Sequence, residues 1–346
     1  MGGPARGASA AGGEGVAWRC GGVATPVAVL PQGDDGWPSR GRPTYVGTRR
    51  EERPGMITDA TARRFRQAPV ERFDTGRAVL AHRRFGQGSP LLLVHGFPLH
   101  GFTWRRLLPA LAERFTCHVV DLVGLGDSEW TSRNDFTWTG HAENLKALAD
   151  HLGLARYGVI AQDTGATISR CLVRIDAARV HRLAIINTEI PGHRPPWVRQ
   201  YQSLMQIPGT TLALRALLRS RLYRRSAAAF GGCFTDLDLL DGAFHEAFVE
   251  PLIHSGRRAE GLREYLVGLR DWAVVDRMRE WHAEMRLPVL LVWGEDDPTF
   301  PVETARPMAA QFPDCRGFVT IPHTKLLPHE EQPDAVGRPL LEFLAA

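Results

Sequence analysis

The chain has 346 residues, of which 44% are hydrophobic, enough for one large buried core with roughly 100 residues left for an insertion or a tail. Its net charge of +4 arises within residues 1 to 68, which hold ten arginines and six acidic residues, so the rest of the chain is neutral and no nucleic-acid partner is expected. The five cysteines are scattered without a C-x-x-C pair, a pattern that fits neither a disulfide framework nor a zinc site and favours a cytoplasmic protein.

Residues 1 to 68 are predicted to form a disordered N-terminal extension, because their Gly, Ala, Pro and Arg content shows neither helical nor strand period. The codons of Glu51 and Glu52 can form a ribosome-binding sequence a short distance upstream of the Met56 codon. Translation is therefore expected to begin at Met56. No apolar run approaches the roughly 18 residues that span a bilayer, and neither secretion nor a membrane partner is expected.

From residue 77 onward, predicted strands and helices alternate, which is typical of an α/β fold with a mostly parallel sheet and helices on both faces. Short apolar runs predict strands over residues 78–85, 91–96, 118–124, 157–162, 182–189, 287–295 and 316–322. Helical periods predict helices over residues 104–115, 137–153, 164–175 and 334–345.

Between Glu189 and Leu287 the pattern changes to helical periods alone, punctuated by prolines. This predicts a helical cap over residues 191–285, inserted into an α/β core made of residues 69–190 and 286–346. Open α/β folds bind their ligands at the carboxyl edge of the sheet, so the insertion is expected to cover that edge.

A sharp strand-to-helix turn is predicted in "AQDTGA", residues 161–166, where small residues flank Asp163. The alternative is that Asp163 is an ordinary helix N-cap. Upstream, the turn "HGFP" after a buried strand can present a backbone N–H to an oxyanion. The N–H groups of Phe97 and Thr164 are therefore expected to converge near Asp163, and His95 is expected to have a structural role.

With these motifs, the chain resembles the α/β-hydrolase family, and more closely its branch of haloalkane dehalogenases, fluoroacetate dehalogenases and epoxide hydrolases. The resemblance covers about residues 77–346 and rests on "HGFP", "DLVGLGDS", "AQDTGA", "VWGEDDPTFP" and "PHEEQPDAV". It implies that Asp163 attacks an sp3 carbon and forms an alkyl ester. Ser128 in "DLVGLGDS" follows a loop without elbow geometry and is expected to be structural. It also implies that Asp297, or alternatively Glu189, orients a histidine that activates water.

The histidine itself departs from the family pattern. When "PHEEQPDAV" is aligned without gaps, the histidine position falls on Leu326, beside Lys325. Leucine cannot transfer a proton, and lysine is normally protonated at neutral pH. Either His323 replaces the usual base through a shifted loop, or no base is present; His329 is expected on the surface.

The leaving-group side also differs, since Thr164 stands where the family usually has a tryptophan whose indole N–H helps to hold halide. Three tyrosines of the insertion, Tyr201, Tyr223 and Tyr265, are candidates to protonate an opening epoxide oxygen. Each could equally be an ordinary packing residue. The tryptophans of the insertion favour a small apolar molecule as ligand.

Two functions stay open. One is a hydrolase that acts on a small apolar halide or epoxide, and the other is a non-hydrolytic protein of the same fold, either a ligand binder or a lyase or cyclase of specialised metabolism. No cofactor or metal is predicted, because the chain has no G-x-G-x-x-G after a strand, no phosphate loop and no clustered metal ligands. The oligomeric state is not predicted.

Overall fold

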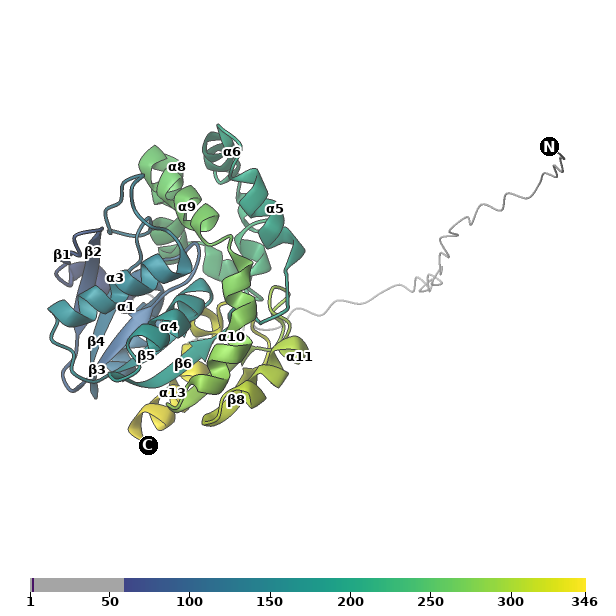
Figure 1. The fold of residues 1–346 in the computed structure, drawn as a ribbon. Helices are drawn as coiled ribbons and strands as arrows, with labels where there is room; N and C mark the ends of the chain where they lie inside the picture. Colours follow the sequence, from purple (N-terminus) through teal and green to yellow (C-terminus); the bar gives the residue numbers. More distant parts are fainter. Residues whose placement is uncertain (1, 3–58) are drawn as a thin grey trace, which may run out of the picture. The chain divides into compact units, whose positions relative to one another are not determined.

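The computed structural model describes Gly2 and residues 59–346 (Figure 1). The elements named below all lie within residues 59–346. The predicted start at Met56 and the predicted disorder of residues 3–58 lie outside the described residues.

Helix α1, Asp59–Gln67, lies within the stretch that was predicted to be disordered, and the prediction was wrong there. Ala62 and Phe65 are one helical turn apart and are 1% and 3% exposed. The Phe65 ring lies 5.5 Å from that of Phe85 and 5.3 Å from that of Phe102, centroid to centroid. One apolar stripe on an arginine-rich helix is enough to anchor it, which average composition did not indicate.

In the described part of the chain, eight strands form one sheet in the order β1-β2-β4-β3-β5-β6-β7-β8. The pairs β1–β2 and β2–β4 are antiparallel, and the remaining pairs are parallel. Strand β1 was not predicted; the other seven lie where the apolar runs placed them, which confirms the predicted α/β architecture. Their bounds are β1 Glu71–Asp74, β2 Val79–Phe85, β3 Ser89–Val94, β4 Phe115–Asp121, β5 Tyr157–Gln162, β6 Val180–Ile186, β7 Val289–Gly294 and β8 Cys315–Ile321.

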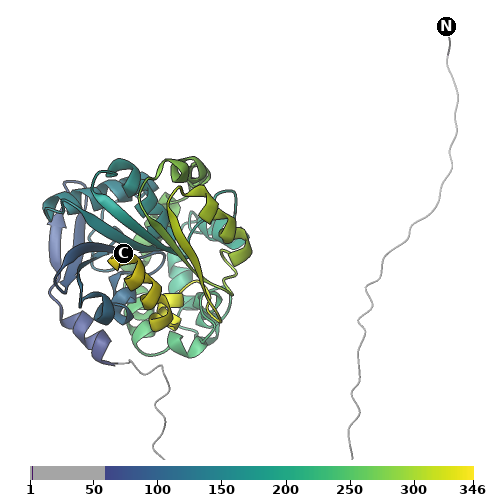
Figure 2. The same cartoon turned by 90° about the horizontal axis from the view of Figure 1, so that it is seen from below.

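Helices cover both faces of this sheet. On one face α3 (Trp138–His151) packs against α4 (Thr164–Ile175), which in turn contacts α10 (Trp272–Glu284). On the other face α13 (Pro333–Ala345) contacts α2 (Leu108–Leu111) and strands β7 and β8 (Figure 2). The helix predicted over residues 104–115 is divided into a 3-10 helix, Gly101–Arg106, and α2, and Phe115 already belongs to β4.

Between β6 and β7 the chain is helical, as its sequence period predicted. The segment contains α5 Pro196–Leu204, α6 Thr210–Leu217, α7 Arg221–Arg224, 3-10 turns Phe230–Gly232 and Leu237–Leu240, a π-helical turn His245–Val249, α8 Glu250–His254, α9 Gly256–Gly268 and α10. After β7 follow α11 Val302–Ala305, a 3-10 helix Arg306–Gln311 and α12 Pro328–Glu331. None of the helices in residues 59–346 combines the length and apolar character needed to cross a bilayer.

Candidate active site

Asp163 occupies the sharp turn between β5 and α4. Its φ of 52° and ψ of −133° lie in a backbone region that residues other than glycine rarely adopt. The turn also lies very close to the one after β3: a Cβ added to Gly165 would lie 2.1 Å from the carbonyl oxygen of His95, and one added to Gly96 would lie 2.5 Å from Asp163 Oδ2. Glycine at these two positions is therefore a steric requirement of the turn.

The Asp163 side chain does not cap helix α4, which removes the N-cap alternative. Instead, Phe97 N donates a 2.8 Å hydrogen bond to Asp163 Oδ2, and the backbone N–H of Thr164 also favours the ionised form of this carboxyl. Asp163 is only 6% exposed, so backbone dipoles rather than water must offset the cost of a charge there.

His95 stabilises the turn that carries Phe97. Leu122 N donates to His95 Nε2 at 2.9 Å, so the ring proton is on Nδ1, which donates to the Gly96 carbonyl at 3.0 Å. Burial lowers the pKa of His95 to about 4, and the ring stays neutral at physiological pH. His95 therefore has the structural role that the sequence predicted.

Asp297 follows β7 and is bound to Asn187, a residue that sequence reasoning did not single out. Asn187 Nδ2 donates to Asp297 Oδ2 at 2.7 Å, and Thr299 N donates to Asp297 Oδ1 at 2.8 Å. Gly294 N donates to Asn187 Oδ1 at 2.9 Å, which fixes the orientation of the amide. Burial raises the pKa of Asp297 to about 7, despite these donors.

Glu189, the alternative acid, is bound to two threonine hydroxyls. Thr167 Oγ1 and Thr188 Oγ1 donate to Glu189 Oε2 at 2.5 and 3.0 Å, and Thr188 Oγ1 also lies 2.8 Å from the carbonyl oxygen of Asp163. Arg170, fully buried, donates through Nη2 to both hydroxyls at 2.5 and 2.9 Å. Because the guanidinium occupies lone pairs of both hydroxyls, the Thr167 proton is directed toward the Glu189 carboxylate, and the single Thr188 proton is shared between that carboxylate and the Asp163 carbonyl.

Burial raises the pKa of Asp163 well above its usual range, and the nearby charges of Glu189 and then Asp297 raise it further. The hydrogen bonds from Thr164 N and Phe97 N act in the opposite direction. The ionised form of Asp163 is therefore expected to appear at a higher pH than that of an ordinary aspartate.

One side chain of the helical insertion reaches this site. Tyr265 on α9 is fully buried, its hydroxyl lies 2.8 Å from Thr164 Oγ1, and its ring stacks on Phe97 at 6.1 Å. By contrast, Tyr201 and Tyr223 both bond to the Ala228 carbonyl and take no part in the site.

A model of the family described as alpha/beta hydrolase fold matches residues 89–332. The chain belongs to this family. Haloalkane dehalogenase 2 of Mycobacterium tuberculosis is 29% identical over 280 residues, which cover 78% of this chain and 93% of that protein. The soluble epoxide hydrolase of Corynebacterium sp. is 40% identical over 107 residues, 31% of this chain and 37% of that protein.

The crystal structure of haloalkane dehalogenase DbeA from Bradyrhizobium elkani superposes with a TM-score of 0.67 at 21% identity, covering 81% of this chain and 98% of that one. This similarity shows the shared fold. The family match and the two relatives support the predicted branch of the α/β hydrolases and the assignment of the chain as a hydrolase.

In this α/β hydrolase, Leu326 lies beside the strand that carries Asp163. It is 6% exposed, and its carbonyl accepts a 3.4 Å hydrogen bond from Gln162 Nε2. His323 is exposed in the preceding turn, at a φ of 56°. Within residues 59–346, no hydrogen bond joins a histidine ring to the carboxylate of Asp163, Asp297 or Glu189, so the structure does not bring His323 to the three acids.

His329 is buried, and the expectation of a surface position was wrong. Its Nε2 lies 2.7 Å from Thr103 Oγ1, and its ring packs on Trp104 at 5.0 Å. The buried ion pair between Arg105 and Glu330, 2.7 Å long, fixes α12 against the 3-10 helix after β3. This inward attachment of α12 could not be read from the local sequence.

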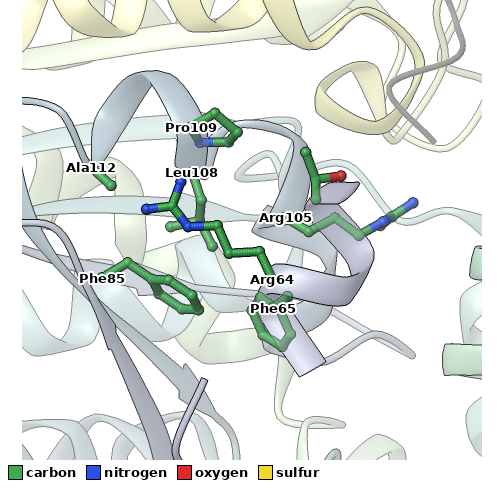
Figure 3. Close-up of a pocket in the computed structure, with 8 residues that line it drawn as sticks. Arg64, Phe65, Phe85, Arg105, Leu108, Pro109 and Ala112 are labelled. Atoms are coloured by element: carbon green, nitrogen blue, oxygen red, sulfur yellow. The ribbon is translucent and has the colours of Figure 1, made fainter. Parts of the chain in front are cut away.

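The cavity in Figure 3 is separate from these residues. It lies among α1, β2 and α2, next to Phe65, Phe85 and Leu108, and its volume of about 10 Å³ is close to that of a single water molecule. Within residues 59–346, no three histidine, cysteine or carboxylate side chains come together as metal ligands would.

Proposed function

We propose that this α/β hydrolase uses Asp163 to attack an sp3 carbon of a small apolar halide or epoxide. The observation that supports this is the Asp163 carboxylate in the strand-to-helix turn, where it accepts a hydrogen bond from Phe97 N. Attack forms a carbon–oxygen bond to the carboxylate and breaks the bond to halide, which leaves as the anion, or to the epoxide oxygen, which takes up a proton.

Of the two substrate classes, we favour the epoxide. An opening epoxide needs a proton donor, and Tyr265 lies next to the nucleophile through its hydrogen bond with Thr164. Burial raises the pKa of Tyr265 well above its usual range, so its hydroxyl keeps its proton. Thr164 also stands in place of the tryptophan whose N–H would hold halide.

Hydrolysis of the ester needs a base, and Asp297 is the group that we assign to this step in place of histidine. Its pKa of about 7 allows it to take a proton from water near neutral pH. The second candidate function is non-hydrolytic, as a ligand binder or as a lyase or cyclase, and it is favoured by Leu326 at the usual histidine position.

Intact-protein mass measured during incubation with a terminal epoxide or a primary alkyl halide tests both functions. The parent should release product, Asp297→Asn should accumulate an adduct on the peptide that contains Asp163, and Asp163→Asn should form none. His323→Ala is the matched control and should behave as the parent, because His323 is exposed. Neither adduct nor product with any substrate would contradict covalent catalysis and support the non-hydrolytic function.

A further inference from the structure

The first helices of the insertion expose an unusual amount of apolar surface. Among the described residues, seven large hydrophobic side chains are exposed, and six of them lie between positions 197 and 222. We call these six side chains the apolar insertion face: Trp197, Leu204, Ile207, Leu212, Leu217 and Leu222. The two most exposed, Leu222 and Leu212, have 86% and 65% of their surface open to solvent. Patches of this kind usually mark an interaction site.

The six side chains of the apolar insertion face are exposed on α5, α6 and α7 and in the turn between α5 and α6. On α5, Trp197 and Leu204 are two helical turns apart and share one side, whereas Gln202, on the other side, is buried. On α6 and just after it, Leu212 and Leu217 are exposed while Leu218 is buried. Both helices pack against α9 and form the outer margin of the insertion (Figure 1).

The same segment is strongly basic. Residues 190–235 contain seven arginines and neither aspartate nor glutamate. Three of these arginines pair with acids elsewhere in the insertion: Arg194 with Asp276, Arg221 with Asp241, and Arg225 with Asp238 and Asp241. In the part of the chain that the structure describes, no ion pair joins a carboxylate to the other four, which are Arg199, Arg215, Arg219 and Arg224.

We propose that the apolar insertion face binds to an anionic lipid surface. Helices that lie in a membrane interface combine leucine and tryptophan, which enter the acyl boundary, with arginines that contact anionic headgroups. A symmetric contact between two copies of the chain fits less well, because it would place the arginine-rich patch against itself. Peripheral binding needs no spanning helix, so this proposal replaces the expectation of no membrane partner and does not depend on the chemistry of Asp163.

Cosedimentation of the full chain with vesicles tests the proposal. Vesicles of phosphatidylcholine mixed with phosphatidylglycerol should bind the protein, and added salt or phosphatidylcholine alone should weaken binding. The double variant Leu212→Ser/Leu222→Ser should bind the vesicles at least about tenfold more weakly than the parent, because each leucine contributes buried apolar area. The double variant Arg199→Gln/Arg219→Gln should have an affinity for anionic vesicles that is lower by about fivefold for each charge removed. Its affinity for vesicles of phosphatidylcholine alone should not change.

Ile175→Ser is the matched control, since Ile175 is the seventh exposed large hydrophobic residue and lies on α4, outside the apolar insertion face. It should bind as the parent does, and circular dichroism should show that all variants are folded. The proposal is overturned if the parent does not bind anionic vesicles, or if Ile175→Ser weakens binding as much as the leucine variant. A dimer in sedimentation velocity that the leucine variant dissociates would also overturn it, in favour of a second copy of the chain.

Discussion

Asn187 Nδ2 donates a 2.7 Å hydrogen bond to Asp297 Oδ2, while the carbonyl oxygen of Asn187 accepts from Asp163 N at 2.6 Å. One residue thus links the two acids. We expect Asn187→Ala to lower the free energy of unfolding by about 3 kcal/mol, because Asp297 Oδ2 and Gly294 N both lose their bond to the Asn187 amide. Asn187 also has a φ of 31°, so Asn187→Gly should be less destabilising than Asn187→Ala by about 1 kcal/mol. Urea unfolding measures the free energy of unfolding of both variants. Equal losses in the two would contradict backbone strain at position 187.

Removal of the buried guanidinium should be costly. Arg170→Met is expected to lower the free energy of unfolding by about 3 kcal/mol, because the Glu189 charge then has no compensating cation. Adding Glu189→Gln should recover part of this loss, since the uncompensated charge is gone. A double-mutant cycle measured by urea unfolding reads the coupling directly, and additive losses would show that the two groups do not interact.

The contribution of Asp297 to stability should fall between pH 5 and pH 8, while buried histidines such as His95, whose pKa is lowered, contribute in the opposite direction below pH 6.5. The pKa of Asp297 is about 7 in the fold, against a reference value of 3.8, so the folded chain keeps a proton that the unfolded chain has released. Over this interval the contribution is a loss of about 2 to 3 kcal/mol, and it levels off above pH 7. Asp297→Asn should remove that part of the slope. An unchanged slope in the variant, measured by urea unfolding at both pH values, would contradict the shift.

Replacement of the Tyr265 hydroxyl should separate the two substrate classes. If Tyr265 protonates the opening epoxide, Tyr265→Phe should slow alkylation of Asp163 by an epoxide about 100-fold. Alkylation by a primary halide needs no proton and should change only a few-fold. Thr164→Val, which removes the hydroxyl bonded to Tyr265, is the companion variant. Single-turnover mass spectrometry measures both rates, and equal slowing of both substrates would argue against the role of Tyr265 as proton donor.

A histidine at position 326 should restore the usual base. Leu326 lies beside Gln162, the residue before Asp163. If Asp163 forms the proposed ester, the imidazole of Leu326→His is expected to speed its discharge about 100-fold. Leu326→Asn is the control, because it adds a polar side chain that cannot accept a proton. Discharge by the two variants at the same rate, followed by intact mass after a pulse of substrate, would show that position 326 does not reach the ester.

The sequence predicted strand β5 and helix α4 with the bounds that the structure has, because a continuous apolar run meets a helical period at a turn of small residues. It did not predict Arg170 or Asn187. An arginine on an amphipathic helix normally faces solvent, and nothing local shows that Arg170 faces the buried hydroxyls of Thr167 and Thr188. The path of the loop around His323 was also beyond prediction, since a loop has no period that fixes which side chain faces inward.

Gly96 and Gly165 matter for anyone who wishes to redirect this enzyme by directed evolution. Both positions are closed to diversification, because any side chain there would collide with the backbone or with the Asp163 side chain. Thr164 and Tyr265, by contrast, present side chains rather than backbone to each other, and their hydroxyls are bonded. A library that randomises these two positions together, and leaves both glycines fixed, will vary the side chains next to Asp163. It will also avoid variants that cannot fold because of a substitution at Gly96 or Gly165.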